Sequence, residues 1–256
     1  MSFFYSSFYL LAGIVLLYLG ADYLVKGSAN VARIFGVKPL IVGLTIVAFG
    51  TSMPEFMVSM FGVLHNAPDI SVGNIIGSNI ANIGLILGIA GLIAPITLKH
   101  DHVRQQLLIL LAGTLIFCLF AYNGISRLEG VLFLIIIIIY VIYLIRSSQK
   151  DKVREKVSET DTSVFRNILY IIGGIIGLVI GSRGIILGAT DIAEYFGISQ
   201  IVIGMTIVAV GTSLPELAAS IMAQVKNESD ISIGNIIGSN LFNMFFVAGG
   251  AATVKG

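Results

Sequence analysis

The stretch Gly43–Glu55, GLTIVAFGTSMPE, occurs again at Gly204–Glu216 as GMTIVAVGTSLPE. The two copies lie 161 residues apart, and the same spacing separates the two copies of GNIIGSN that begin at Gly73 and Gly234. Two motifs repeated at one spacing indicate that a structural unit has been duplicated. The chain is therefore expected to fold as two related halves, with the repeated motifs at corresponding places.

The composition of the 256-residue chain indicates a polytopic membrane protein. Hydrophobic residues make up 56% and charged residues 11%, and the mean hydropathy is +0.97. A soluble domain carries about 25% charged residues, so this chain lacks the charge needed to cover a surface exposed to water. That excludes an ordinary soluble enzyme, a nucleic-acid-binding protein and a disordered tail. The net charge of +1 implies no strongly acidic or basic partner.

Segments of about 20 mostly apolar residues predict helices that cross the hydrocarbon core, because lipid offers no water to satisfy backbone polar groups. The expected fold class is an all-α polytopic membrane protein with about eight spans. They are expected at residues 8–25, 39–64, 70–96, 107–122, 130–145, 164–189, 201–225 and from 231 onward.

Five spans, an odd number, precede the second copy of the motif, so the second copy must enter the membrane upside down. Inverted repeats are typical of secondary transporters. We expect residues 1–146 to form a first five-helix repeat, 147–163 a cytoplasmic linker, and 164–256 a second repeat that is inverted and incomplete. In a five-plus-five arrangement the last two helices would be missing, and the sequence leaves open whether the chain is a fragment or naturally short.

The basic residues predict the orientation in the membrane. With the N-terminus outside, 12 of the 15 Lys and Arg residues fall on the cytoplasmic side, as the positive-inside rule favours. No Lys or Arg precedes Lys26, so the first apolar segment lacks the basic start of a signal peptide and is expected to be a retained helix.

Each repeat carries one glutamate, Glu55 or Glu216, where a charge is expensive. Estimates for a charge at the bilayer centre begin at about 2.5–3.5 kcal/mol, and ionisable residues there are functional by default. Pro54 and Pro215 immediately precede the glutamates. Because proline has no N–H and clashes with the carbonyl four residues earlier, it breaks the helix and frees backbone oxygen. The alternative for the glutamates is that they are buried structural carboxylates held by neighbouring donors. The alternative for the prolines is that each makes a simple helix kink.

The remaining polar groups around these glutamates are oxygen donors. They are the hydroxyls of Thr51, Ser52, Thr212 and Ser213 at the breaks, and Ser78, Asn82, Ser239 and Asn243 in or just after the two GNIIGSN copies. Hard cations prefer such ligands, and Ca²⁺ accepts about 6–8 oxygens. The same set with fewer carboxylates per ion suits Na⁺, whereas softer metals favour nitrogen or sulfur. The glycines of GNIIGSN are expected to pack helices closely.

With GTSMPE and GTSLPE each followed by GNIIGSN, the sequence resembles the cation/calcium exchanger superfamily, in its prokaryotic sodium/calcium exchanger branch. The resemblance implies ten helices in two inverted units and antiport of Na⁺ against Ca²⁺ by alternating access. It implies a plasma (inner) membrane location, with the lipid bilayer and the two transported ions as partners, no organic cofactor and no nucleic acid. The implied ion ligands are Glu55, Glu216, Ser52, Ser78, Ser213 and Ser239, the carbonyls of Thr51, Thr212, Ala48 and Ala209, and the central Asn82 and Asn243.

Two other functions remain open from the sequence. A Ca²⁺/H⁺ or other cation antiporter would use protons on the buried glutamates in place of Na⁺. A truncated membrane subunit would bind ions or a partner without transporting. An enzyme is not expected, because the chain has no HExxH motif, nucleophile–base pair or phosphate-binding loop. Some relatives in the superfamily carry Asp at the position of Asn243, and the resemblance implies that the potassium-dependent branch relies on that aspartate. The asparagine in this chain therefore argues against potassium dependence.

Overall fold

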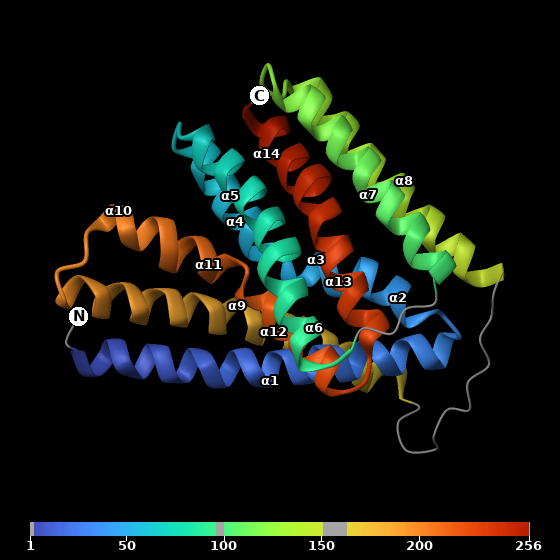
Figure 1. Cartoon of the computed structure of the whole chain (residues 1–256), viewed down its shortest axis with the longest axis horizontal. Helices are drawn as coiled ribbons and strands as arrows, with labels where there is room; N and C mark the ends of the chain where they lie inside the picture. Colours follow the sequence, from blue (N-terminus) through green and yellow to red (C-terminus); the bar gives the residue numbers. More distant parts are fainter. Residues whose placement is uncertain (1–2, 96–99, 151–162, 256) are drawn as a thin grey trace.

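The computed structural model describes residues 3–95, 100–150 and 163–255, and these ranges contain helices and turns but no strand. Six helices are long and apolar enough to cross a membrane, and the number is eight if each of two bent helix pairs counts as one span. That agrees with the eight spans predicted from hydropathy. Figure 1 shows two long helices lying side by side, with several of the other helices running obliquely to them.

The elements of the first half are α1 (Phe3–Phe35), α2 (Pro39–Val42), η1 (Gly43–Val47), α3 (Ala48–Thr51), α4 (Met53–Leu64), α5 (Pro68–Ala81), η2 (Asn82–Ile86), α6 (Leu87–Ile93), α7 (His100–Ala121) and α8 (Arg127–Lys150). Those of the second half are α9 (Val164–Tyr195), α10 (Gln200–Ile203), η3 (Gly204–Val208), α11 (Ala209–Thr212), α12 (Leu214–Val225), α13 (Ser229–Phe242), η4 (Asn243–Val247) and α14 (Ala248–Lys255). The η elements are single π-helical turns.

Local structure repeats along the chain at the spacing of the sequence motifs. Each element from α2 to η2 begins and ends 161 residues before its equivalent between α10 and η4, for example α4 before α12. The limits of the predicted repeats stay a prediction, because most of the linker at 147–163 lies outside the described residues. The helix α8 continues to Lys150, beyond the expected boundary at 146.

The helices α1 and α9 pack antiparallel along most of their length (Figure 1). Glycines form the contact: a methyl group built on Gly20 would lie 2.7 Å from the backbone of Leu178, and one on Gly174 would lie 2.6 Å from the backbone of Leu24. Small residues allow helix backbones to approach this closely in a membrane. Because α1 has 33 residues and therefore a length of about 50 Å, it must tilt to fit a hydrocarbon core of about 30 Å.

The two bent pairs break where the prolines predict. The axes of 39–51 and 53–64 differ by 43°, and those of 206–212 and 214–225 differ by 52°. Ser52 and Ser213 leave the helical conformation at the break, with ψ of 4° and 5°. Proline then occupies the first turn of the following helix, where its missing N–H has no cost.

The two halves pack differently, although their motifs match. In the second half, a methyl group on Gly234 would lie 2.4 Å from the carbonyl oxygen of Leu40, and one on Gly238 would lie 2.7 Å from that of Leu44. In the first half, a methyl group on Gly73 or Gly77 would meet no atom within 4 Å. The predicted packing role of these glycines is therefore correct for α13 and wrong for α5 in this conformation.

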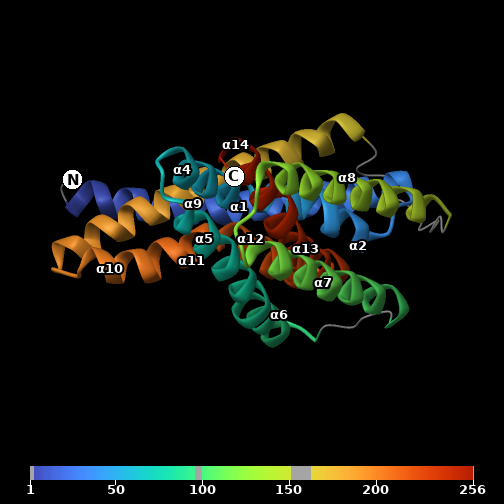
Figure 2. The ribbon, with the colours of Figure 1, turned by 90° about the horizontal axis from the view of Figure 1, so that it is seen from above.

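The α7–α8 hairpin and the α10–α11 segment lie toward opposite ends of the long helices, as the two ribbon views agree (Figures 1 and 2). The helix α8 packs against α14, and α7 packs against α13. Aromatic side chains form this core, with Phe133 meeting Phe245 edge-on at a centroid separation of 5.2 Å. On this side α13 and α14 are enclosed: 94% of the apolar window within 229–254 is buried, against 28% within 68–93.

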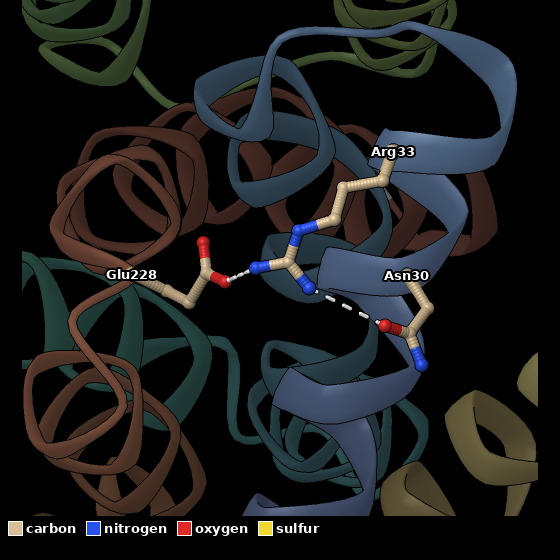
Figure 3. Close-up of polar contacts among 3 residues, drawn as sticks. All are labelled: Asn30, Arg33 and Glu228. Carbon is tan, nitrogen blue, oxygen red and sulfur yellow. Dashed lines mark hydrogen bonds and ion pairs between the residues drawn. The ribbon is translucent and has the colours of Figure 1, made fainter. Parts of the chain in front are cut away.

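Polar bonds fix the ends of the long helices. At the end of α1, Arg33 forms an ion pair with Glu228 of the α12–α13 turn and donates a 3.4 Å bond to Asn30 (Figure 3). Asn30 also donates to Asn167 of α9, at 3.0 Å. At the other end Ser6 donates to Asp191, at 3.1 Å. These two bonds join equivalent positions of the repeats, because Ser6 corresponds to Asn167 and Asn30 to Asp191.

Candidate functional site

The two glutamates occupy corresponding places at the two helix breaks. Glu55 lies in the first turn of α4 and Glu216 in the first turn of α12. Both side chains are fully buried. A helix N-terminus favours a negative charge, because the free N–H groups and the positive end of the helix dipole both lie there. The breaks thus place each carboxylate at a helix start inside the protein.

Serines from opposite repeats hold the carboxylates. Ser213 donates to Oε1 of Glu55 over 3.3 Å, and its repeat equivalent Ser52 donates to Oε1 of Glu216 over 3.2 Å. Ser78 adds a 3.4 Å bond to Oε1 of Glu55. Each repeat therefore supplies the carboxylate of one pair and the hydroxyl of the other, so both pairs join the two repeats.

One oxygen of each carboxylate remains without a hydrogen-bond partner among the described residues. These are Oε2 of Glu55 and Oε2 of Glu216, both buried. A buried carboxylate oxygen left unpaired carries a large desolvation cost, and a bound cation removes that cost. The arrangement therefore suits a positively charged ligand at this place.

The threonines beside the serines behave differently in the two halves. Both hydroxyls lie 3.3 Å from the carbonyl oxygen three residues earlier, but the Thr51 hydroxyl also lies 3.0 Å from Oδ1 of Asn235, to which it can donate, and 3.2 Å from the hydroxyl of Ser239. Thr212, its equivalent, donates to the carbonyl of Ala209 at 3.3 Å. Ser239 is thus bonded to Thr51 and Asn235, whereas Ser78 is bonded to a glutamate.

The predicted carbonyl ligands are near the breaks but partly occupied. The carbonyl of Ala48 accepts the Ser52 N–H at 3.0 Å and the Thr51 hydroxyl at 3.3 Å. The Thr51 hydroxyl has a single hydrogen, for which this carbonyl competes with Oδ1 of Asn235 at 3.0 Å. The second lone pair of the Ala48 carbonyl is therefore available to an ion when the hydroxyl donates to Asn235. The carbonyl of Gly211, freed by Pro215, accepts the Ser182 hydroxyl of α9 at 2.9 Å.

The central asparagines Asn82 and Asn243 each begin a π-helical turn. Such turns are frequent at functional sites because they change the direction of the side chains around them. Both residues are fully buried. Asn243 donates to Oδ1 of Asn79 at 3.2 Å, and its own Oδ1 has no partner in the described part of the chain. Neither amide atom of Asn82 has one.

Sequence reasoning missed the asparagines that support the glutamates. Asn74 donates to the backbone carbonyl of Glu55 and to Ser59, both at 3.0 Å. Asn235 donates to the carbonyl of Glu216 at 3.2 Å and to Ser220 at 2.9 Å. Their identical position in the two GNIIGSN copies was the available signal. A polar residue repeated inside an apolar helix needs a partner, and here the partner is the neighbouring helix.

The donor set is poor in groups that bind transition metals. No group of three or more His, Cys, Asp or Glu residues able to hold a metal occurs in the described ranges. The central donors are two carboxylates, hydroxyls, amide oxygens and backbone carbonyls, which are ligands of hard cations.

Comparison with known proteins gives the family. The sequence profile described as "Sodium/calcium exchanger protein" matches residues 5–146 and 166–256. Sodium/calcium exchanger MaX1 of Methanosarcina acetivorans is 34% identical over 94% of this chain and 80% of its own length. Putative antiporter CaxA of Alkalimonas amylolytica is 38% identical over 95% of this chain and 79% of its own length.

Solved structures of the sodium-calcium exchanger NCX_Mj share the fold. One, soaked with 10 mM Na⁺ and 10 mM Sr²⁺, superposes with a TM-score of 0.87 at 36% identity and covers 98% of this chain and 82% of that one. Another, soaked with 10 mM Na⁺ and no Ca²⁺, gives a TM-score of 0.89. The expected fold class, an all-α membrane transporter, is confirmed. The matches extend over both halves and both motif pairs, and the chain belongs to the sodium/calcium exchanger family.

Proposed function

We propose that this protein is a secondary antiporter that exchanges Na⁺ for Ca²⁺ across a membrane, with the ions bound between Glu55 and Glu216. The observation that carries the proposal is the pair of fully buried carboxylates, each with one oxygen lacking a partner in the described residues. Family membership supports exchange of cations, and the donor chemistry supports the choice of ions.

The charges favour these two ions. Two carboxylates balance one Ca²⁺, and the surrounding hydroxyl and amide oxygens complete a flexible oxygen shell of the kind that Ca²⁺ accepts. Na⁺ uses the same ligand type with less charge. Because both ions need the same carboxylates, loading with one excludes the other. The proposed ligands are those expected from the resemblance, and the carbonyl of Ala48 is available to an ion when the Thr51 hydroxyl donates to Asn235.

The unequal packing of the halves supports alternating access. The segment α2–η1–α3 lies against α13 at backbone contact, whereas Gly204 at the start of η3, like Gly73 of α5, faces open space. Two halves of matching sequence in two different packings are what an inverted-repeat transporter has when one side of its site is closed and the other open. We propose that the halves exchange these packings during transport, as inverted repeats at 1–146 and 164–256.

The proposed location is the plasma (inner) membrane of a prokaryotic cell with the N-terminus outside. Inner membrane protein YrbG of Escherichia coli, 36% identical over 94% of this chain, supports the location. The excess of basic residues on one side supports the orientation. Introducing a cysteine at the N-terminus and testing whether it reacts with a membrane-impermeant thiol reagent in intact cells would check the orientation.

The function is tested by measuring ⁴⁵Ca²⁺ uptake into proteoliposomes under an imposed Na⁺ gradient. The variants are Glu55→Gln and Glu216→Gln, which keep shape but remove charge. Glu129→Gln is the matched control, because Glu129 is a partly exposed glutamate at the start of α8, away from the site and bonded to Ser126. We expect Na⁺-driven uptake in the wild type and the control, and loss of uptake in both site variants.

Uptake that persists in either site variant would refute the proposed ion site. A pH gradient is the second arm of the same experiment. Uptake driven by pH and not by Na⁺ would replace the proposal with Ca²⁺/H⁺ exchange, in which the unpaired carboxylate oxygens take protons. Absence of flux under both gradients, with intact Ca²⁺ binding by the purified chain, would favour a subunit that binds ions without transporting them.

A further inference from the structure

An asparagine is a cation ligand only through its carbonyl oxygen, because its NH₂ group has no available lone pair, carries a partial positive charge and donates hydrogen bonds. A buried asparagine beside a cation site therefore needs something to turn its NH₂ group away from the ion. At Asn243 the structure contains such a group. Nδ2 of Asn243 donates to Oδ1 of Asn79, while Oδ1 of Asn243 is buried and without a partner among the described residues.

Asn79 is itself held in the orientation that makes it an acceptor. Its Nδ2 donates to the backbone carbonyl of Asn240, at 3.4 Å. Because its NH₂ group is used there, the oxygen of Asn79 faces Asn243. The bonds run from one repeat to the other, since α5 carries Asn79 and α13 carries Asn240.

The equivalent position shows that this contact is specific. Asn240 corresponds to Asn79, and Asn82 corresponds to Asn243. The NH₂ group of Asn240 also donates to a backbone carbonyl, that of Ile236 at 2.7 Å, which leaves Oδ1 of Asn240 as an acceptor. Yet that oxygen and both amide atoms of Asn82 lack partners within the described ranges. The orienting bond is therefore made on the closely packed side and absent on the open side.

We propose that Asn79 is a positioning residue that sets the amide orientation of Asn243, so that the Asn243 oxygen points to the transported cation. The inference rests on the proposed Ca²⁺ site and adds a residue to it. Asn79 does not contact the ion in this role. It matters because position 243 carries an amide with two unlike ends, whereas a carboxylate would present oxygen in either orientation.

That difference supplies the test. Ca²⁺ affinity is measured by isothermal titration calorimetry on the purified full chain in Na⁺-free detergent buffer, with Mg²⁺ as the comparison ion. Asn79→Ala is made in the wild type and again together with Asn243→Asp. We expect Asn79→Ala to weaken Ca²⁺ binding about tenfold in the wild type, the scale of one hydrogen bond. In the Asn243→Asp protein we expect a loss of about threefold or less.

Equal losses in the two proteins would overturn the proposal, because a merely structural role of Asn79 would not depend on residue 243. Asn30→Ala is the matched control, since Asn30 also makes an interhelical asparagine bond, at the end of α1, and its loss is expected to leave affinity unchanged. A second variant, Asn79→Asp, keeps the acceptor oxygens and is expected to bind Ca²⁺ at least as tightly as the wild type. Weak binding by a folded Asn79→Asp protein would also overturn the proposal.

Failure of the proposed site is distinguishable from failure of this inference. If the wild type binds Ca²⁺ and Glu216→Gln does not, the site stands, and the Asn79 comparison decides the inference alone. If the wild type does not bind Ca²⁺, both are overturned.

Discussion

Replacing Gly234 with alanine and comparing it with Gly73→Ala tests the unequal packing of the halves. The two glycines occupy the same position of identical heptapeptides. A methyl group on Gly234 would lie 2.4 Å from the carbonyl oxygen of Leu40 and 2.8 Å from the backbone nitrogen of Leu44. Ordinary contact begins near 3.4 Å, so the helices must separate by about 1 Å. A methyl group on Gly73 would meet nothing within 4 Å.

The expected energies follow from these contacts. Overpacking costs about 1–3 kcal/mol, and the upper end applies at Gly234, because backbone atoms cannot rotate away as a side chain can. Alanine recovers about 1 kcal/mol of helix propensity at either position. Gly234→Ala should therefore lower the free energy of unfolding by about 2 kcal/mol, and Gly73→Ala should leave it unchanged or raise it by about 1 kcal/mol.

Thermal unfolding in detergent, followed by circular dichroism because the chain has no tryptophan, measures the difference. A difference of about 2–3 kcal/mol corresponds to about 4–12 °C in Tm for a chain of this size. Gly238→Ala and Gly77→Ala form a second matched pair, with the same direction expected. Equal shifts for the two members of both pairs would refute the conclusion that only α13 is closely packed by its glycines.

Three further substitutions test individual bonds. Ser182→Ala leaves the buried carbonyl of Gly211 without its 2.9 Å hydroxyl donor and should lower the free energy of unfolding by about 1–3 kcal/mol; an unchanged Tm would show that this carbonyl finds another donor. Asn235→Leu removes the amide that joins four groups around the second glutamate and should cost at least as much in the same assay, with Ca²⁺ affinity also reduced. Glu228→Gln removes the ion pair to Arg33, which is partly exposed, so it should change stability by less than about 1 kcal/mol, and the difference from wild type should shrink in high salt. A larger, salt-independent loss would contradict that view of the pair.

The fold was largely predictable because the features that determine it can be identified along the sequence, without knowing which helices are in contact. Apolar length gives the spans, and the offset between GTSMPE and GTSLPE gives the relation of the halves. Proline before each glutamate gives the bends, which occur at Ser52 and Ser213 as the chemistry of proline requires. The burial of Glu55 and Glu216 follows from the same pattern, since a charge in an apolar helix must face the protein.

The cross-bonding of the site was not predictable, because it depends on which helix of one repeat faces which helix of the other. Nothing in the motif states that Ser213 bonds Glu55 rather than its neighbour Glu216. The unequal packing of the two halves could not be predicted from the sequence for a stronger reason. Gly73 and Gly234 begin identical heptapeptides, so identical local preferences cannot choose which copy packs closely; the choice belongs to a conformation of the whole molecule.

The exchange of serines between the carboxylates also bears on how such a protein can arise. Neither half contains a complete site, since each glutamate takes a hydroxyl from the other half. A half-length chain alone would have a carboxylate without its partner serine, but two identical half-length chains related by a two-fold axis would restore both bonds at once. A functional ancestor assembled from two copies of one short gene product therefore needs no new contact at its centre. Fusion of the two copies then lets each diverge, as Asn30 and Asp191 have done, while the central bonds stay paired.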